Sequence, residues 1–274
     1  MTMRLLLRPA FVVAALCLAG CDVHVGDNGG VSLDISHGKA TDQWSRSYTI
    51  APGGQLEIIN VSGAIDVAPA SGSTIEVHAT REARAGSDEA AQTLLKTQPK
   101  IVEQVASDRV RVEVDNPSSE GGFSSSRTSV QFRVEVPPGL KATFRTRNGQ
   151  VRLDNVDGRF EAQTTNGGVT GRDLTGSIRA STVNGGVQMG ITALRGDIDV
   201  RAVNGGIRLE LPAALDADVD ASTVNGGVTV DDALPLATTE RSRAHIAGRL
   251  NKGGPKIVAQ TTNGGVRVMP RAAR

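Results

Sequence analysis

The 274-residue chain carries a formal net charge of +1 and contains 32 glycines, two cysteines and four histidines. One cysteine lies in the N-terminal apolar segment, so the remaining one excludes a thiolate zinc site. Beyond this segment, no apolar run approaches transmembrane length. The histidines form no H-x-x-x-H pair: His24, His37, His78 and His245.

The first 20 residues have the pattern of a secretory signal peptide. Arg4 and Arg8 form a basic region before the short apolar run Ala10–Leu18. The run ends in Leu18-Ala19-Gly20-Cys21, which resembles the lipobox of bacterial lipoproteins. In that family the peptide is cleaved before the cysteine, which then carries lipid chains. The resemblance implies lipid attachment at Cys21; the alternative is an ordinary cleaved signal with an incidental cysteine.

The cysteine count agrees with a lipid anchor. Cys17 lies in the removed segment, so the mature chain starts with its single thiol and forms no internal disulfide. Several buried acyl chains, at about 0.8 kcal/mol per methylene, make a firm anchor. Asp22 resembles the inner-membrane retention signal of enteric lipoproteins. We therefore expect a lipid-anchored protein of the bacterial cell envelope that faces the periplasm. Asp22 slightly favours the inner membrane, and the outer membrane or the cell surface stays open.

Residues 21–46 are expected to be the lipidated cysteine and a flexible tether, because this segment is polar and contains glycine. The β-strand domain is expected over residues 47–274. Its first strands alternate apolar and polar residues around a corner at Val61-Ser62-Gly63. A helix-bearing insertion is expected at about 83–115, where Ser87 caps a helix that Pro99 ends.

One motif recurs from residue 141 to the end of the chain. Its asparagines are separated by 18, 18, 20, 21 and 38 residues, and periods near 20 are typical of stacked repeats. The last spacing predicts a degraded copy around Asn251–Gly254. Asparagine and glycine enter the left-handed backbone region easily, so a strand turns sharply at them. The expected structural corners are Asn148, Gly149, Asn166, Gly167, Gly168, Asn184, Gly185, Gly186, Asn204, Gly205, Gly206, Asn225, Gly226, Gly227, Asn263, Gly264 and Gly265.

Apolar and polar residues alternate on both sides of each corner. In one copy, Phe160, Ala162 and Val169 are apolar, while Glu161 and Gln163 between them are polar, so one face of each strand is buried. Two all-β architectures fit. The favoured one is a β-solenoid, similar to a parallel β-helix, of stacked short strands with Asn-Gly-Gly corners and one helix-bearing insertion. The other is an antiparallel meander with Asn-Gly hairpins.

The pattern resembles the DUF4097 family of adhesin-like β-strand repeat proteins. The matching residues are "VEVPPGL" at Val134–Leu140, "TRNGQV" at Thr146–Val151 and the later NGG corners. The resemblance covers roughly Ser47–Arg274. It implies a role in the cell envelope, such as envelope-stress sensing or adhesion, and it brings no catalytic residue.

The sequence contains none of the phosphate-binding, nucleophile or calcium-repeat motifs considered below. No two glycines lie two residues apart, which excludes a G-x-G phosphate loop, and no G-x-S-x-G elbow occurs. Aspartates near the corners suggest calcium, but the required repeat spacing is missing. We expect no catalytic residue, no metal and no cofactor. The aspartates concerned are Asp154, Asp157, Asp173 and Asp197.

The C-terminal end is basic. Residues 241–274 include eight basic residues and no acidic one, which could steer this end toward anionic lipid or cell wall; the alternative is an ordinary solvated surface. The residues concerned are Arg241, Arg243, Arg249, Lys252, Lys256, Arg267, Arg271 and Arg274.

The sequence therefore predicts a non-catalytic envelope lipoprotein that acts as a structural or interaction scaffold, with a role in envelope-stress sensing. One alternative is a cell-surface adhesin. A second is a polysaccharide-binding or polysaccharide-active β-helix, although few aromatic residues are available as sugar platforms. The expected partners are the membrane, through the lipid anchor, and a protein or a cell-wall polysaccharide. Nucleic acid is not expected outside the cytoplasm.

Overall fold

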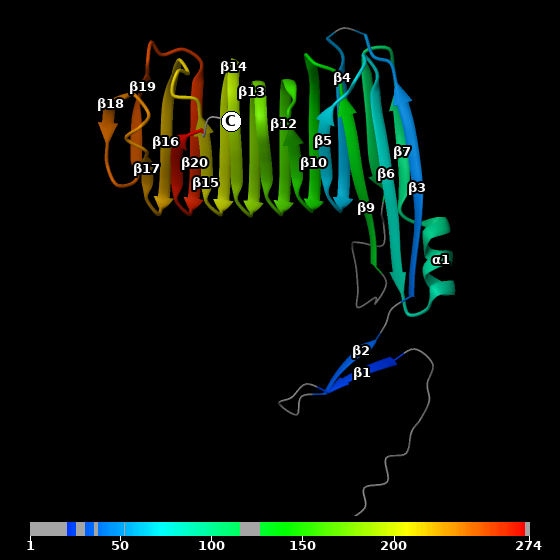
Figure 1. The fold of residues 1–274 in the computed structure, drawn as a ribbon. Coiled ribbons are helices and arrows are strands. Elements are labelled where there is room, and N and C mark those ends of the chain that lie inside the picture. The colour runs from blue at the N-terminus through cyan, green and yellow to red at the C-terminus, as the bar shows by residue number, and fades with distance from the viewer. Residues whose placement is uncertain (1–20, 26–30, 36–37, 52, 116–126, 272–274) are drawn as a thin grey trace, which may run out of the picture.

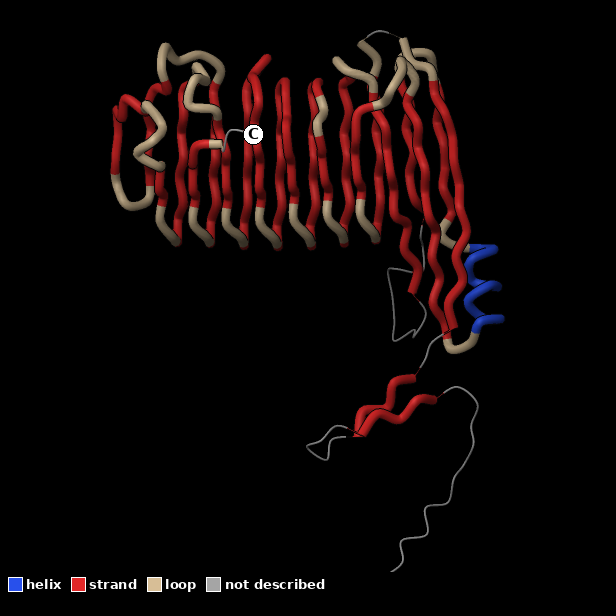
Figure 2. Tube along the Cα trace, viewed as in Figure 1, coloured by secondary structure: helices blue, strands red, loops and turns tan. Residues whose placement is uncertain are grey.

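The structure is a computed structural model that describes residues 21–25, 31–35, 38–51, 53–115 and 127–271. The expected signal peptide and Arg274 lie outside the described residues. Strands make up most of the described chain, with one helix (Figures 1 and 2). The all-β prediction is confirmed.

The repeats form a solenoid of parallel coils. Strand β10 (Leu140–Asn148) pairs in parallel with β12 (Asp157–Asn166), which pairs in parallel with β13 (Val169–Asn184). The next strand, β14 (Val187–Asn204), continues the series. Each corner asparagine lies opposite the asparagine of the neighbouring coil. This parallel register excludes the antiparallel meander and confirms the solenoid.

Each coil contributes to two sheets that are joined at the asparagine corners. Sheet A leads into the corners and sheet B leaves them. In spatial order, sheet A consists of β7 (Lys100–Val105), β8 (Arg109–Asp115), β4 (Gln55–Ser62), β10, β12, the ends of β13 and β14, β20 (Lys256–Asn263), β16 (Ala217–Asn225), β19 (His245–Leu250) and β18 (Leu236–Arg241). Sheet B consists of β3 (Gly38–Tyr48), β6 (Ile75–Ala85), β9 (Arg127–Val136), β5 (Ile65–Pro69), β11 (Val151–Asp154), the starts of β13 and β14, β15 (Ile207–Leu211), β21 (Val266–Pro270) and β17 (Val228–Val230).

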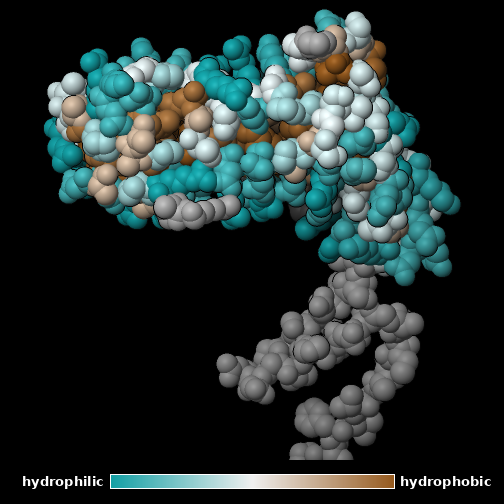
Figure 3. All heavy atoms as spheres, turned by 45° about the horizontal axis from the view of Figure 1, so that its top comes forward, coloured by the Kyte–Doolittle hydropathy of each residue, from teal (hydrophilic) through white to brown (hydrophobic). Residues whose placement is uncertain are grey.

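The core lies between the two sheets and follows from the period-two alternation. Phe144 and Phe160 point inward from adjacent coils, with ring centroids 6.3 Å apart. Small and branched side chains such as Ala162 and Val169 fill the neighbouring positions. Polar side chains cover most of the outer surface, and apolar ones show along the edge that faces forward in Figure 3.

The first glycine of each corner is required by contact between coils. A Cβ atom placed on Gly185 would lie 2.1 Å from the carbonyl oxygen of Gly167, and the first glycines of all six corners have such a contact at 1.9–2.3 Å. The second glycine has more room, and Gln150 occupies its place in the first copy. The corner asparagines are absent from the non-glycine residues with positive φ. The left-handed role predicted for them is therefore wrong.

The corner asparagines instead form a continuous ladder of side-chain amides. Five of the six Nδ2 groups donate to the Oδ1 atom of the coil before them in the stack, at 2.7–3.0 Å. We call this the asparagine ladder. Side-chain amide ladders of this kind support stacked in-register strands. Its members in spatial order are Asn148, Asn166, Asn184, Asn204, Asn263 and Asn225.

A second column of buried hydroxyls ties each coil to the next. Five threonines, two residues before a corner asparagine, donate to the carbonyl of a neighbouring corner glycine at 2.7–3.1 Å. The equivalent carbonyl of Gly185 receives no such hydroxyl, because Ala202 occupies that position in the column. The donors are Thr146, Thr164, Thr182, Thr223 and Thr261.

We expect Ala202→Thr to stabilise the protein. The new hydroxyl would reach the carbonyl of Gly185 at a buried site, and such a hydrogen bond contributes about 1 kcal/mol. Urea denaturation of both proteins measures the change in free energy of unfolding. Ala202→Val is the matched control, since it adds the same volume without the hydroxyl. Equal stabilities of the two variants would contradict this role of the column.

The C-terminal coil does not follow chain order. Strand β20 lies between β14 and β16, so Asn263 pairs with both Asn204 and Asn225. The hairpin β18–β19 then closes sheet A by antiparallel pairing with β16. Asn251–Gly254 connects β19 to β20, away from the asparagine ladder. The prediction of a degraded copy at this place is therefore wrong. The long spacing between Asn225 and Asn263 arises because the β18–β19 hairpin lies between them in the sequence.

The N-terminal end is a cap that extends past the corners. Strand β3 begins at Gly38 and pairs with β6 over its whole length, so the tether expected over 21–46 is wrong for residues 38–46. The error arises because β3 is an edge strand whose polar side faces water. Closer to the N-terminus, β1 (Cys21–Val25) and β2 (Val31–Ile35) pair antiparallel.

The expected insertion contains the only helix of the described chain, α1 (Asp88–Thr97), which Ser87 caps by accepting a hydrogen bond from the backbone N–H of Ala90. Apolar residues of α1 pack on β3 and β6. At the same end, the hydroxyl of Tyr48 donates to Glu103 of β7 at 2.7 Å. Burial and this contact raise the pKa of Tyr48. The bond links the end strands of the two sheets.

Candidate functional site

Basic side chains from three distant segments meet on sheet A near the N-terminal cap. Parallel pairing places β8, β4, β10 and β12 side by side, and alternate residues of each strand face outward. We call the resulting cluster the basic patch. It consists of Arg109 and Arg111 on β8, Lys141, Arg145 and Arg147 on β10, and Arg159 on β12.

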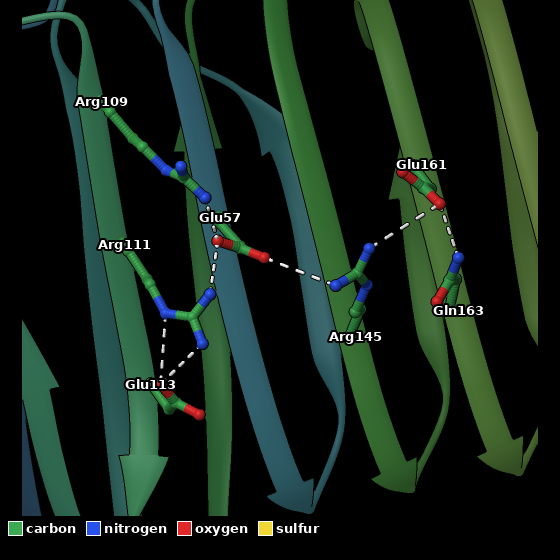
Figure 4. Close-up of polar contacts among 7 residues, drawn as sticks. All are labelled: Glu57, Arg109, Arg111, Glu113, Arg145, Glu161 and Gln163. Carbon is green, nitrogen blue, oxygen red and sulfur yellow. Dashed lines mark hydrogen bonds and ion pairs between the residues drawn. The ribbon is translucent and has the colours of Figure 1, made fainter.

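Glu57 holds three of these arginines. Its carboxylate is 2.9 Å from Arg109, 2.8 Å from Arg111 and 3.5 Å from Arg145 (Figure 4). Its side chain is only 6% exposed. Burial alone would raise the pKa of Glu57, but the hydrogen bonds and charges of Arg109 and Arg111 outweigh it and lower the pKa. Glu57 therefore stays ionised and fixes the directions of the arginines.

Two further carboxylates belong to the same network. Glu113 pairs with Arg111 at 2.8 Å, and Glu161 lies 3.9 Å from Arg145 while accepting from Gln163 (Figure 4). The patch therefore combines six cations with the three carboxylates of Glu57, Glu113 and Glu161. Its net charge is positive.

Three cations of the patch form no ion pair with any described residue: Lys141, Arg147 and Arg159. All three are exposed, and Lys141 lies directly opposite Arg159 on the adjacent strand. Lys141 and Arg159 line a hollow of about 450 Å³, together with the buried Thr143 and the carboxylates of Glu161, Asp197 and Asp199. The three cations are free to bind an anionic group from outside.

On the other half of sheet A, internal partners occupy most of the charges. Asp199 contacts Arg179 at 3.5 Å and Arg201 at 2.9 Å, and Asp218 contacts Arg249 at 3.3 Å. Lys256 and Arg241 also form no ion pair with a described residue, but the largest group of neighbouring cations on this sheet is the basic patch.

Comparison with protein families gives one match. The model of the family described as Toastrack DUF4097 matches residues 23–269. The chain belongs to the Toastrack DUF4097 family. The expected resemblance is confirmed, and the match includes the N-terminal cap and the C-terminal hairpin as well as the repeats.

Solved structures similar to this Toastrack chain come from several bacteria. A putative cell adhesion protein from Clostridium sporogenes ATCC 15579 is 10% identical, with a TM-score of 0.48, over 85% of this chain and 100% of the other. A putative adhesin from Bacteroides fragilis NCTC 9343 is 11% identical, with a TM-score of 0.29, over 84% and 97%. One from Parabacteroides distasonis ATCC 8503 is 11% identical, with a TM-score of 0.26, over 84% and 97%. No curated protein matches the sequence significantly.

The basic residues predicted at the C-terminal end of the Toastrack chain do not come together. Arg249 and Lys256 lie on sheet A beside Asp218, whereas Arg267 lies on sheet B. Arg271 forms an ion pair with Asp173 and donates to the carbonyl of Ile191. Arg241, Arg243 and Lys252 are exposed on the terminal hairpin and its loops.

Three of the four aspartates considered for calcium have structural partners, whereas the Oδ1 atom of Asp154 is buried without a hydrogen-bond partner in the described chain. Asp157 contacts Arg195 at 3.0 Å, and Asp197 accepts from the backbone of Lys256 at 2.8 Å. Within the described ranges, no group of three His, Cys, Asp or Glu residues is placed to hold a metal ion. The described chain also contains no helix of the length and apolar character needed to cross a membrane.

His245 bridges three strands of the C-terminal end. Its Nε2 atom is 3.1 Å from Asp220 of β16, and its Nδ1 atom is 3.2 Å from Glu240 of β18. The hydrogen bond to Glu240 has the largest effect and raises the pKa of His245; burial lowers it, and the hydrogen bond to Asp220 raises it further, so the pKa is raised overall. A raised folded-state pKa means that protonation stabilises the fold.

We expect His245→Gln to remove a pH-dependent part of the stability. The stabilisation by His245 is fully present below its unfolded pKa of about 6.5 and is lost as the pH rises through the raised folded-state value. Melting temperatures of both proteins between pH 5 and pH 9 test this, because only the parent should lose stability through this group. Glu240→Gln should reduce the effect. Melting temperatures that change with pH in the same way in the parent and in His245→Gln would contradict this role of His245.

Proposed function

We propose that this chain is a non-catalytic, lipid-anchored protein of the bacterial cell envelope that holds another envelope component on sheet A. The observation that carries the proposal is the basic patch. Glu57 fixes three arginines on a rigid sheet, and Lys141, Arg147 and Arg159 beside them have no partner among the described residues. Such an arrangement suits binding by charge complementarity.

The lipobox at the N-terminus supports the anchor. If Cys21 carries the lipid, residues 22–37 separate the membrane from the first strand of the body, β3. Sixteen residues reach at most about 55 Å when fully extended. The body would therefore stay near the membrane while remaining free to orient.

Metabolic labelling with a fatty acid tests the anchor. We expect the parent protein to take up the label and to fractionate with membranes, and Cys21→Ala to lose both properties. Cys17→Ala is the matched control, because Cys17 lies in the segment expected to be removed. Retention of the label by Cys21→Ala would refute the anchor at this position.

Protease treatment of intact and permeabilised cells separates a scaffold from an adhesin. Digestion only after permeabilisation supports a periplasmic scaffold with a role in envelope-stress sensing. Digestion on intact cells would replace this proposal with a surface adhesin.

A further inference from the structure

We infer that the basic patch lies on the anionic lipid surface of the membrane that anchors the chain. The inference rests on the proposed lipid anchor and adds the surface and the orientation through which the body meets the bilayer. Its partner is the phosphate-bearing headgroup layer. Sheet A would face the bilayer and sheet B would face away from it.

The first argument is the arrangement of the free cations. Along β10, Arg147 lies about 6.6 Å beyond Arg145, which Glu57 holds, and Lys141 lies about 13 Å before Arg145. Arg159 lies on the next strand, about 4.8 Å from Lys141. The cations therefore form a two-dimensional array on a sheet surface. A planar array is suited to a planar layer of phosphates, because several side chains can reach headgroups at the same time.

The second argument is the contrast with sheet B. On sheet B, Arg152 contacts Asp66 at 3.1 Å, and the arginines without an ion pair to a described residue are spread along the sheet, among them Arg133 on β9, Arg172 on β13, Arg208 on β15 and Arg267 on β21. The basic patch differs from these in density, because it gathers six cations on the adjacent strands β8, β10 and β12 around β4.

The third argument is proximity. The segment between Cys21 and β3 is short, so an anchored body samples the membrane surface at a high effective concentration. Each cation near an anionic bilayer strengthens binding about fivefold. The three unpaired cations alone would then contribute about 100-fold, and the attraction would decrease with added salt.

Site-specific fluorescence tests the orientation in the anchored protein. Cys21 carries the lipid, so one introduced cysteine is the only free thiol of the mature chain. Thr165→Cys places a fluorophore on sheet A, opposite Arg147, and Gln188→Cys places one on sheet B. The labelled proteins are reconstituted into vesicles that contain spin-labelled lipid as a quencher.

We expect quenching at position 165 in vesicles containing phosphatidylglycerol, with little in pure phosphatidylcholine or at high salt. Position 188 should remain unquenched in all of them. Equal quenching at the two positions, or quenching at 165 that is independent of lipid charge, would overturn the inference.

A charge-matched pair of variants shows whether the patch is responsible. The triple variant Lys141→Gln, Arg147→Gln, Arg159→Gln should abolish the quenching. The triple variant Arg133→Gln, Arg208→Gln, Arg267→Gln removes the same charge from sheet B and should preserve it. Equal losses would mean that net charge alone is responsible, and the assignment to the patch would fail.

Flotation of the Cys21→Ala protein with added vesicles separates this inference from the proposed anchor. Binding to phosphatidylglycerol vesicles that decreases about 100-fold in the sheet A triple variant supports the patch, even if labelling shows no lipid on Cys21. Binding to soluble polyphosphate without binding to vesicles would assign the patch to an anionic polymer and overturn the lipid assignment.

Discussion

Gly185→Ala is expected to destabilise the protein by about 3 kcal/mol or more, which is a large effect for the addition of one methyl group. The new Cβ atom would lie 2.1 Å from the carbonyl oxygen of Gly167 on the next coil. Backbone atoms of two stacked coils cannot move apart there without breaking the hydrogen bonds on both sides. Denaturant unfolding followed by circular dichroism measures the loss.

Gly186→Ala is the matched control for this prediction. Its Cβ atom would lie 3.2 Å from the carbonyl oxygen of Gly206, which a small shift relieves, so the cost should stay below about 1 kcal/mol. The two variants add the same methyl group to adjacent residues of one corner. Similar losses of stability would contradict a requirement for the first glycine that comes from the distance between coils.

Glu57→Gln should produce the second large effect, a loss of about 2 kcal/mol. Removing one partner of a buried ion pair typically costs 3–5 kcal/mol, and the partial exposure of the three arginines reduces this value. Glu113→Gln, at a side chain that is 41% exposed, should cost less than about 0.5 kcal/mol. Thermal melts at neutral pH compare the two variants.

The stabilisation by Glu57 also depends on pH. Its folded-state pKa is lowered, so its contribution is complete above the unfolded value of about 4.3 and is lost as the pH falls through the folded value. The difference in melting temperature between parent and Glu57→Gln should therefore shrink in acid. A difference that stays constant from pH 7 to pH 3 would rule out ionised Glu57 as the centre of the network.

The repeated corners made the architecture predictable. Alternation of apolar residues around Asn166 and Asn184 defines a buried face, and a period near 20 residues is long enough for one coil. A solenoid of stacked coils also places the asparagines and threonines in columns along its axis, but the reason for the corner glycines was not predictable in the same way. Local backbone preference suggested a turn, whereas the asparagine ladder and the glycine contacts exist only between coils.

The basic patch could not be predicted, because its members lie far apart in the sequence. Arg109 and Arg159 are 50 positions apart in the sequence. They lie on the same face only because parallel pairing places β8, β4, β10 and β12 side by side in one sheet. The alternation of Arg145 and Arg147 along one strand was the available signal. The sequence instead suggested that the basic residues of the C-terminal end contact an anionic surface, although strand pairing distributes these residues over both sheets.

The position of β20 affects how the molecule resists unravelling. In stacked repeats each unit contacts only its neighbours, so the terminal units fray first. Here the C-terminal coil is enclosed by β14 on one side and β16 on the other. Detaching it exposes both neighbours and requires their contacts to break together. The same arrangement delays folding of this end, because the hydrogen-bond partner of Asn204 is Asn263, which lies 59 residues further along the chain. Synthesis must therefore approach its end before the stack can close, and the completed protein should open at this end as a cooperative block.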